Sequence, residues 1–273
     1  MSSSTTPAAL ALSQKWLGNR QASARLALAC LDLTSLNEQD TEAGIAALCA
    51  RAQSRFGPVA AVCVWPRLAA FARNQLPEHI AVAAVANFPD GSADIERAVR
   101  ETGEIVQSGA QEVDLVLPYT HLLVGNDVVV GDLLAAVRKA SEGLRLKVIL
   151  ETGALVGAAH ILRASKLSLA AGADFLKTST GKTSISASPE AARVMLDAIA
   201  ADPGAANCVG FKPSGGIRSV ADAAVYIALV EEILGMDALT PQRFRIGASS
   251  VLADIESALS GQETTAPAPA GSY

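Results

Sequence analysis

One buried strand that ends in a glycine-rich turn is predicted by the stretch Asp174-Phe175-Leu176-Lys177-Thr178-Ser179-Thr180-Gly181-Lys182. Apolar runs of similar length recur before and after it. Their starts lie roughly thirty residues apart, which is the length of a strand plus a crossover helix. Eight strands are predicted in this way: Ala29–Leu33, Val59–Trp65, Ile80–Phe88, Glu112–Pro118, Arg145–Glu151, Ala173–Thr178, Cys208–Lys212 and Arg243–Gly247.

Eight strand–helix units in one chain predict a (β/α)8 TIM barrel, an α/β fold of a single domain. A doubly wound sheet is the alternative, but open sheets of this size usually have fewer strands. Apolar residues at helical spacing fill the intervals, as between Ile45 and Phe56, where Gly57 can end the helix. Ser188 and Pro189 predict the N-cap and first residue of another helix. We assign the catalytic barrel to residues 21–260, an N-terminal extension or helix to 1–20, and a disordered, Pro-rich tail to 261–273.

The composition excludes several classes of protein. The 273 residues are 50% hydrophobic with a net charge of −5, so no basic surface for nucleic acid is expected. No apolar run has the length of a membrane span, and the first residues lack the basic start of a secretory signal. The four cysteines, at positions 30, 49, 63 and 208, show no paired spacing. They indicate free thiols in a reducing cytoplasm, where we expect the protein to act.

Two lysines lie in predicted strands, Lys177 in the sixth and Lys212 in the seventh. An ammonium group loses its hydration on burial. A lysine there therefore favours a lowered pKa and a neutral amine that can attack a carbonyl carbon. Two neighbouring lysines are expected to lower each other's pKa further. The alternative is that each side chain extends outward from its strand and keeps its charge in water.

Other polar side chains occupy the predicted strands, and in a barrel the chemistry lies at the C-terminal ends of the strands. Charges inside a barrel must form pairs or shift their pKa values. We expect part of the set, Glu112 and Lys147 in particular, to be a structural ion-pair network. The set comprises Asp32, Cys63, Asn87, Glu112 with Asp114 on one face of the fourth strand, and Lys147 with Glu151 on one face of the fifth.

No metal site is expected. The three histidines, at positions 79, 121 and 160, do not fall late in predicted strands and show no ligand spacing. A carbonyl carbon can be activated by a metal or by an iminium group, and this sequence offers lysines for the second route.

Three glycine-rich turns follow the sixth, seventh and eighth predicted strands. Glycine lets the backbone approach an anion closely, and successive N–H groups then form a concave anion site. A phosphate site at the last loops is a recurring feature of TIM barrels. The alternative for each single turn is a tight connection without a ligand. The turns are Thr180-Gly181-Lys182, Ser214-Gly215-Gly216-Ile217-Arg218 and Gly247-Ala248-Ser249-Ser250.

These strings together resemble the deoxyribose-phosphate aldolase family of class I (Schiff-base) aldolases. The resemblance runs from about residue 20 to residue 260, with mild departures at Ser214, where the family often has Ala, and at Ile217, where it often has Val. The matching strings are Leu31-Asp32-Leu33-Thr34, Glu112-Val113-Asp114-Leu115-Val116, Lys147-Val148-Ile149-Leu150-Glu151-Thr152, Phe175-Leu176-Lys177-Thr178-Ser179-Thr180-Gly181-Lys182, Gly210-Phe211-Lys212-Pro213-Ser214-Gly215-Gly216 and Arg245-Ile246-Gly247-Ala248-Ser249-Ser250.

The resemblance implies a metal-independent lyase without a cofactor. It would cleave 2-deoxy-D-ribose 5-phosphate reversibly to D-glyceraldehyde 3-phosphate and acetaldehyde. It further implies that Lys177 forms the imine, that Lys212 lowers the pKa of Lys177, and that Asp114 takes part in proton transfer. The expected partners are a phosphosugar and an aldehyde, with no nucleic acid or membrane, and a homodimer is a further expectation. The substrate-binding residues it implies are Asp32, Thr34, Leu36, Cys63, Thr180, Gly181, Lys182, Gly215, Gly216, Ile217, Arg218, Gly247, Ser249 and Ser250.

For the C-terminal tail that ends in Tyr273, two alternatives are open. The tail is either a solvated end without a role or a lid that folds over the barrel mouth and places the phenol near the substrate.

Two other functions are open at this point. An isomerase or transaldolase would share the barrel and the phosphate turns, although an isomerase needs no imine. A phosphosugar-binding regulator would keep the turns but has no use for two buried lysines.

Overall fold

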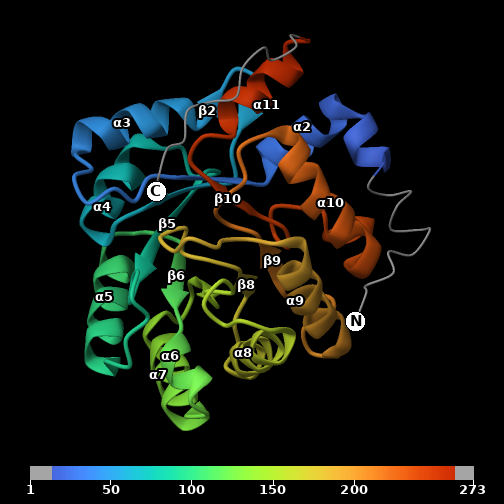
Figure 1. Ribbon diagram of the computed structural model, residues 1–273. Coiled ribbons are helices and arrows are strands. Elements are labelled where there is room, and N and C mark those ends of the chain that lie inside the picture. The colour runs from blue at the N-terminus through green and yellow to red at the C-terminus, as the bar shows by residue number, and fades with distance from the viewer. Residues whose placement is uncertain (1–13, 262–273) are drawn as a thin grey trace.

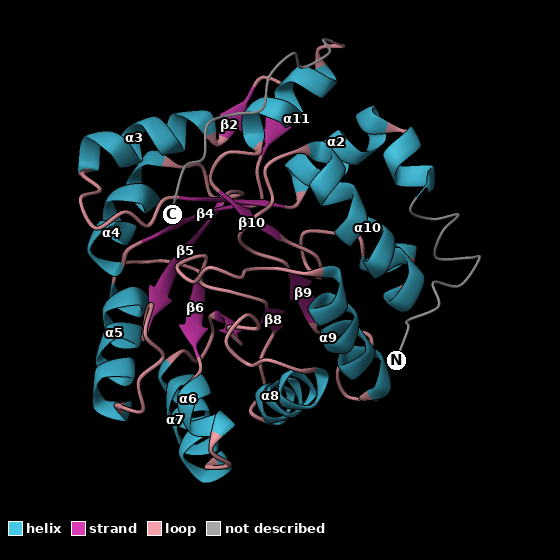
Figure 2. Cartoon of the chain, viewed as in Figure 1, coloured by secondary structure: helices cyan, strands magenta, loops and turns pink. Residues whose placement is uncertain are grey.

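The computed structural model describes residues 14–261. Within this range eight parallel strands form a central ring with helices around the outside (Figures 1 and 2). Each observed strand falls inside the predicted run, except that the first and the last each end one residue later, so all eight strand predictions are confirmed. The strands are β1 Leu31–Thr34, β4 Ala61–Val64, β5 Ala81–Ala86, β6 Glu112–Val116, β7 Arg145–Ile149, β8 Phe175–Lys177, β9 Gly210–Lys212 and β10 Ile246–Ala248.

The ring closes between the seventh and eighth strands of the barrel. The sheet runs in the order β10-β1-β4-β5-β6-β7-β8-β9, and bridges from Phe211 to Phe244 and from Ser214 to Gly247 join its two ends. The Gly247 N–H donates to the Pro213 carbonyl oxygen at 2.9 Å across this seam. The predicted TIM barrel is therefore confirmed, and the doubly wound alternative is wrong because that fold would leave two open edges.

From α3 to α11 the helices follow one another around the ring in chain order, and α2 lies between α10 and α11 (Figure 1). The Ser188 hydroxyl accepts from the Ala191 N–H at 3.2 Å and Pro189 is the first helical residue, so the predicted start of α9 is confirmed. Within the described residues, the helices from α2 onward are α2 Arg20–Ala29, α3 Glu42–Arg51, α4 Pro66–Gln75, α5 Ile95–Gln107, α6 Tyr119–Leu123, α7 Asp127–Ala140, α8 Ala158–Ala170, α9 Pro189–Ala201, α10 Val220–Leu234 and α11 Leu252–Leu259.

One predicted helix is too long. The helix expected to reach Phe56 ends at Arg51, and a small antiparallel hairpin follows it, with strands β2 Gln53–Ser54 and β3 Gly57–Pro58. Gly57 has a φ of 130°, which only glycine adopts readily, so it forms the hairpin rather than a helix stop. Phe56 is partly buried against the main core from this hairpin, and its helical spacing was therefore misleading.

The strands bury different chemistry on their two faces. Val113, Val148 and Leu176 point outward and pack under the helices in one continuous apolar core. The alternating inward positions carry charged side chains, together with Phe175, which is fully buried. A Cβ on Gly210 would lie 2.3 Å from the Phe175 ring, so glycine at this position makes room for that ring.

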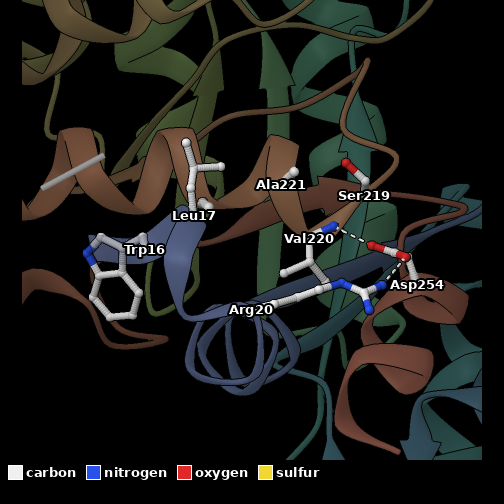
Figure 3. A pocket seen from close by; sticks show the side chains of 8 residues that line it. Trp16, Leu17, Arg20, Ser219, Val220, Ala221 and Asp254 are labelled. Atoms are coloured by element: carbon white, nitrogen blue, oxygen red, sulfur yellow. Dashed lines mark hydrogen bonds and ion pairs between the residues drawn. The ribbon is translucent and has the colours of Figure 1, made fainter. Parts of the chain in front are cut away.

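The first described residues pack against the last helices of the barrel. Arg20 of α2 points toward Asp254 of α11, which also accepts a hydrogen bond from the Val220 N–H of α10, and both distances are 2.7 Å (Figure 3). This contact joins the start of the barrel to its end. The N-terminal extension expected over residues 1–20 is described from residue 14, and Tyr273 lies outside the described residues. Between residues 14 and 261, no helix combines the length and apolar character needed to cross a bilayer.

Candidate active site

Lys177 and Lys212 are direct neighbours at the C-terminal end of the barrel. They end β8 and β9 and face each other in the register of these parallel strands. Relative exposure is 3% for Lys177 and 0% for Lys212. The prediction that both are buried is confirmed, and the alternative of side chains extended into water is wrong.

Asp114 of β6 binds both lysines with a single oxygen. Its Oδ2 accepts from Lys177 Nζ at 2.7 Å and from Lys212 Nζ at 2.7 Å, while its Oδ1 accepts from Lys147 Nζ at 2.7 Å. The carboxylate is fully buried, and the three surrounding ammonium groups hold its pKa well below the usual range against the effect of burial. Asp114 is therefore an ionised group in direct contact with the lysine side chain that is the candidate nucleophile.

The two neighbouring lysines differ in their electrostatics. Burial lowers the pKa of Lys177, the positive charge of Lys212 lowers it further, and Asp114 opposes both effects only in part. Burial also disfavours the charged form of Lys212, but Asp114 and Asp32, the latter at 2.5 Å, raise its pKa above the ordinary lysine value. The expectation of a lowered pKa is therefore wrong for Lys212, because its two carboxylate partners outweigh the effect of burial. It has two carboxylate partners, whereas Lys177 has one, so Lys177 is the residue from which a proton is lost more easily.

Eight linked ionisable side chains, Lys177 among them, fill the inside of the barrel, and we call them the interior ion cluster. The predicted structural pair is confirmed, because Lys147 Nζ lies 2.5 Å from Glu112 Oε2. Asp32, expected to line the substrate pocket, is fully buried within the cluster, between Lys212 and Arg245. Its members are Asp32, Glu112, Asp114, Arg145, Lys147, Lys177, Lys212 and Arg245.

The two arginines of the interior ion cluster were missed from the sequence. Both bind one oxygen of Glu112, Arg145 at 2.8 Å and Arg245 at 2.7 Å. The alternation of inward and outward residues could have identified Arg245, since it lies two positions before the inward-facing Gly247.

Glu151 does not share a face with Lys147 as expected. The strand ends at Ile149, and Glu151 follows with a φ of 56°, so Glu151 does not continue the alternation of faces along the strand. Its carboxylate accepts hydrogen bonds from the hydroxyl and the N–H of Thr180 and from the Thr183 hydroxyl. Glu151 thus fixes the loop after β8, and burial raises its pKa.

A small apolar cluster surrounds the charged centre at the C-terminal end of the barrel. Leu36, Cys63, Val116 and Ile149 belong to it, and the Sγ of Cys63 lies 3.9 Å from Asp114 Oδ2. Burial and the nearby carboxylate raise the pKa of Cys63, so the group is a thiol at neutral pH. This apolar surrounding is consistent with the lowered pKa of Lys177, because it excludes water that would solvate an ammonium group.

Two of the residues expected at strand ends, Thr34 and Asn87, form hydrogen bonds to nearby backbone carbonyl oxygens. The Thr34 hydroxyl donates to the carbonyl oxygen of Asp32 at 2.9 Å. Asn87 donates to the carbonyl oxygens of Val116 and Ser92, so it fixes the loop after β5.

A cavity of about 320 Å³ opens between the loops that follow β8, β9 and β10. Six of the residues expected to bind phosphate line it, and the sequence analysis missed four further lining residues from the loop after β8, which has no regular spacing. The predicted ones are Gly181, Gly216, Ile217, Arg218, Ser249 and Ser250, and the missed ones are Thr183, Ser184, Ser186 and Ala187.

The remaining phosphate candidates lie beside this cavity. A Cβ on Gly215 would lie 2.5 Å from the Ser186 hydroxyl, and one on Gly247 would lie 2.3 Å from the Ser214 hydroxyl, so both glycines permit close loop packing. Lys182 Nζ donates to the Leu36 carbonyl oxygen at 2.9 Å. Within residues 14–261, the buried hydroxyls of Ser179 and Ser214 have no hydrogen-bond partner, and they are available to a bound molecule.

The family model of DeoC/LacD aldolases matches residues 26–256. The chain belongs to this aldolase family. The matched range contains all eight strands of the barrel, the interior ion cluster and the lining of the 320 Å³ cavity. As a DeoC/LacD family aldolase, the protein is a lyase that acts on carbon–carbon bonds.

Solved structures from other organisms have the same architecture as this family member. A Coccidioides immitis protein provisionally named a deoxyribose-phosphate aldolase has 28% identity and a TM-score of 0.75, covering 89% of this chain and 98% of that one. The deoxyribose phosphate aldolase of Aeropyrum pernix, described as a tetramer, has 25% identity and a TM-score of 0.71, covering 93% and 98%. A Toxoplasma gondii protein, also provisionally named a deoxyribose-phosphate aldolase, has a TM-score of 0.81 and 23% identity, covering 91% and 98%, and it supports the fold alone.

Proposed function

We propose that this aldolase cleaves 2-deoxy-D-ribose 5-phosphate to D-glyceraldehyde 3-phosphate and acetaldehyde through an imine on Lys177. One observation carries the proposal. Among the three buried lysines of the interior ion cluster, Lys177 has a lowered pKa, whereas Lys147 and Lys212 have raised ones. Only the neutral form of an amine attacks a carbonyl carbon, so Lys177 is the nucleophile best suited to a neutral solution.

The reaction begins when the Lys177 nitrogen forms a bond to C1 of the open-chain sugar. Loss of water gives an iminium group, which withdraws electrons from C2. Removal of the proton from the C3 hydroxyl then breaks the C2–C3 bond and releases D-glyceraldehyde 3-phosphate. The bonding electrons stay on the enamine, which takes up a proton at C2 and is hydrolysed to acetaldehyde and free Lys177.

Asp114 and Lys212 assist these proton movements in the proposal. Asp114 lies 2.7 Å from Lys177 Nζ, within reach of the protons gained and lost there. Its depressed pKa makes it a group that relays a proton rather than one that stores it. The permanently charged Lys212, at 2.7 Å from the same Asp114 oxygen, disfavours a second ammonium at Lys177.

The 320 Å³ cavity supports a phosphorylated substrate. Glycine backbone, the Ser249 and Ser250 hydroxyls and the Arg218 side chain line it, and these groups suit a phosphate. The loops after β8 and β9 begin directly at Lys177 and Lys212, so one sugar phosphate can reach both regions. In this proposal the partners are a phosphosugar and an aldehyde, and the enzyme acts in the cytoplasm on deoxyribose phosphate from deoxyribonucleoside breakdown.

Reduction with borohydride in the presence of acetaldehyde tests the imine. A stable ethyl adduct should map to the peptide that contains Lys177, and it should be absent from Lys177→Ala. The exposed Lys139 of α7 provides the control, because Lys139→Ala should retain the adduct. An adduct on Lys212 would contradict the assignment. Trapping at Lys177 without cleavage of deoxyribose 5-phosphate would retain the imine but reject the substrate.

A further inference from the structure

A second cavity, of about 440 Å³, lies at the opposite end of the barrel from the lysine pair. It is bounded by the end of α2, the β2–β3 hairpin, and the residues around the starts of β5, β7 and β10. These are the N-terminal ends of the strands, so the cavity is separate from the candidate active site. We call it the basal cavity.

The ionisable side chains that line the basal cavity are all basic. Four basic side chains contribute to it, Arg25, His79, Arg145 and Arg245, and none of its lining residues, all within 14–261, is acidic. Arg25 and His79 are exposed, and their side chains form no ion pair or hydrogen bond within the described part of the chain. Like charges that converge on a concave surface raise the local concentration of anions there.

Two of these basic groups are held in place before any ligand binds. Glu112 Oε1 accepts from both Arg145 and Arg245, and the two guanidinium groups lie 5.7 and 5.8 Å from the centre of the buried Phe175 ring. Fixing an arginine in advance lowers the entropy cost of binding. Arg145 uses Nη1 for Glu112, and across residues 14–261 its Nε and Nη2 have no hydrogen-bond partner. Those N–H groups can therefore serve a ligand.

The interior ion cluster does not neutralise this positive charge. It contains five basic side chains and three carboxylates, so it keeps one positive charge in excess even when Lys177 is a neutral amine. Arg145, Lys147 and Arg245 all pair with Glu112. Of these three, Arg145 is exposed, with 33% of its side chain accessible to solvent. The cluster therefore presents positive charge to solvent through Arg145, which lines the basal cavity.

We propose that the basal cavity is a second anion-binding site, for phosphate or the phosphate group of a small metabolite. Arg145 and Arg25 would contact the anion oxygens, since guanidinium groups match phosphate geometry. His79 and the partly buried Phe56 present flat rings that could contact an organic part of the ligand. The site does not depend on the substrate proposed above.

Nuclear magnetic resonance of the histidine ring protons tests the site with inorganic phosphate as the probe. The signal of His79, assigned by its loss in His79→Gln, should move saturably as phosphate is added. Ser249→Glu, which blocks the cavity at the other end, should leave the midpoint of this titration unchanged. Arg25→Gln should raise the midpoint at least tenfold. Arg100→Gln, on the exposed surface of α5, removes the same charge elsewhere and should leave the midpoint as in the wild type.

A His79 signal that does not saturate, or an equal response in Arg25→Gln and wild type, would overturn the proposal. A loss of the response in Ser249→Glu would overturn it too, because the phosphate would then act from the other end.

A titration with ribose 5-phosphate distinguishes a site for free phosphate from a site for a phosphorylated metabolite. A midpoint well below that of inorganic phosphate indicates a metabolite site, and an equal midpoint indicates a site for the free ion. Arg25→Gln should keep wild-type kcat and KM in phosphate-free buffer.

Discussion

Lys177 and Lys212 have the same side chain and adjacent positions but opposite pKa shifts. The difference comes from the number of carboxylates around each ammonium group, since Lys212 contacts Asp32 and Asp114 whereas Lys177 contacts Asp114. The sequence indicated two buried lysines, but it could not assign their roles. Asp32 lies 180 residues before Lys212, and only the closed barrel brings the two side chains together. The spatial arrangement, and not the motif, separates the nucleophile from its charged neighbour.

Lys212→Leu should move the pH dependence of imine formation to higher pH. Loss of the Lys212 charge removes repulsion and leaves Asp114 to pair more strongly with Lys177, and both changes raise the pKa of Lys177. The neutral amine then forms only at higher pH. The rate of borohydride trapping with acetaldehyde, measured across pH, provides the test. Lys212→Arg keeps the charge and should shift the profile less. A profile unchanged in Lys212→Leu would mean that burial alone sets the pKa.

Glu112→Gln should strongly destabilise the protein, although Glu112 does not touch Lys177. The change leaves Lys147, Arg145 and Arg245 with fewer carboxylates in a buried site, and breaking such a pair typically costs about 3–5 kcal/mol. Urea unfolding measures the free energy. Glu142→Gln, in an exposed turn, is the matched control and should change it by less than about 0.5 kcal/mol. Equal stability of the two variants would show that Glu112 does not offset the cationic excess.

At the scale of elements, regular strands were predictable and irregular segments were not. Runs of apolar residues defined the eight barrel strands because each is buried on both faces. The β2–β3 hairpin was missed because two-residue strands leave no periodic pattern. Glu151 was assigned to the wrong face because the chain leaves the strand at Ile149 with a positive φ two residues later. Thr183 and Ser186, which line the 320 Å³ cavity, lie in a loop whose path depends on hydrogen bonds to distant residues.

Replacing Gly210 of β9 by Ala should destabilise the barrel. The new methyl group would lie 2.3 Å from the Phe175 ring, and overpacking of this kind typically costs about 1–3 kcal/mol. Gly131 of α7 provides a matched control, because a Cβ there meets no atom within 4 Å. Gly131→Ala should stabilise the protein by roughly 0.5–1 kcal/mol, since glycine is a poor helix former. Thermal unfolding should give opposite shifts in Tm, and a common direction would argue against tight packing at Gly210.

Ser249→Glu, at the loop that begins α11, should weaken binding of deoxyribose 5-phosphate far more than of deoxyribose. A carboxylate in the 320 Å³ cavity repels a phosphate but does not affect the unphosphorylated sugar. The KM values for the two sugars measure the effect. A matched change at the exposed Ser260, which lies after α11, should leave both values unchanged. Equal losses for both sugars in Ser249→Glu would contradict the phosphate assignment.

At the scale of the whole molecule, stability should fall as the solution becomes acidic. Despite burial, nearby cations lower the pKa values of Asp32, Glu112 and Asp114 in the folded state. Their unfolded values are about 4, so these carboxylates contribute stability fully above that pH and lose it as the pH falls toward the folded values. Urea unfolding between about pH 6 and pH 2 should show this decline. Asp114→Asn should reduce its slope, and a wild-type free energy independent of pH would contradict the contribution of these groups.

The alternation of charged and apolar residues in the barrel strands has a consequence for how the chain selects its native strand alignment. Because successive side chains point to opposite faces, a slip of one residue would turn Asp114, Lys147, Lys177 and Lys212 outward under the helices. There they would meet Val113, Leu176 and their apolar neighbours without a counter-ion, at a high cost in free energy. Misaligned barrels are thus penalised at four neighbouring strands at once. The side chains that carry the proposed chemistry also act as markers that reject incorrect strand pairing during folding.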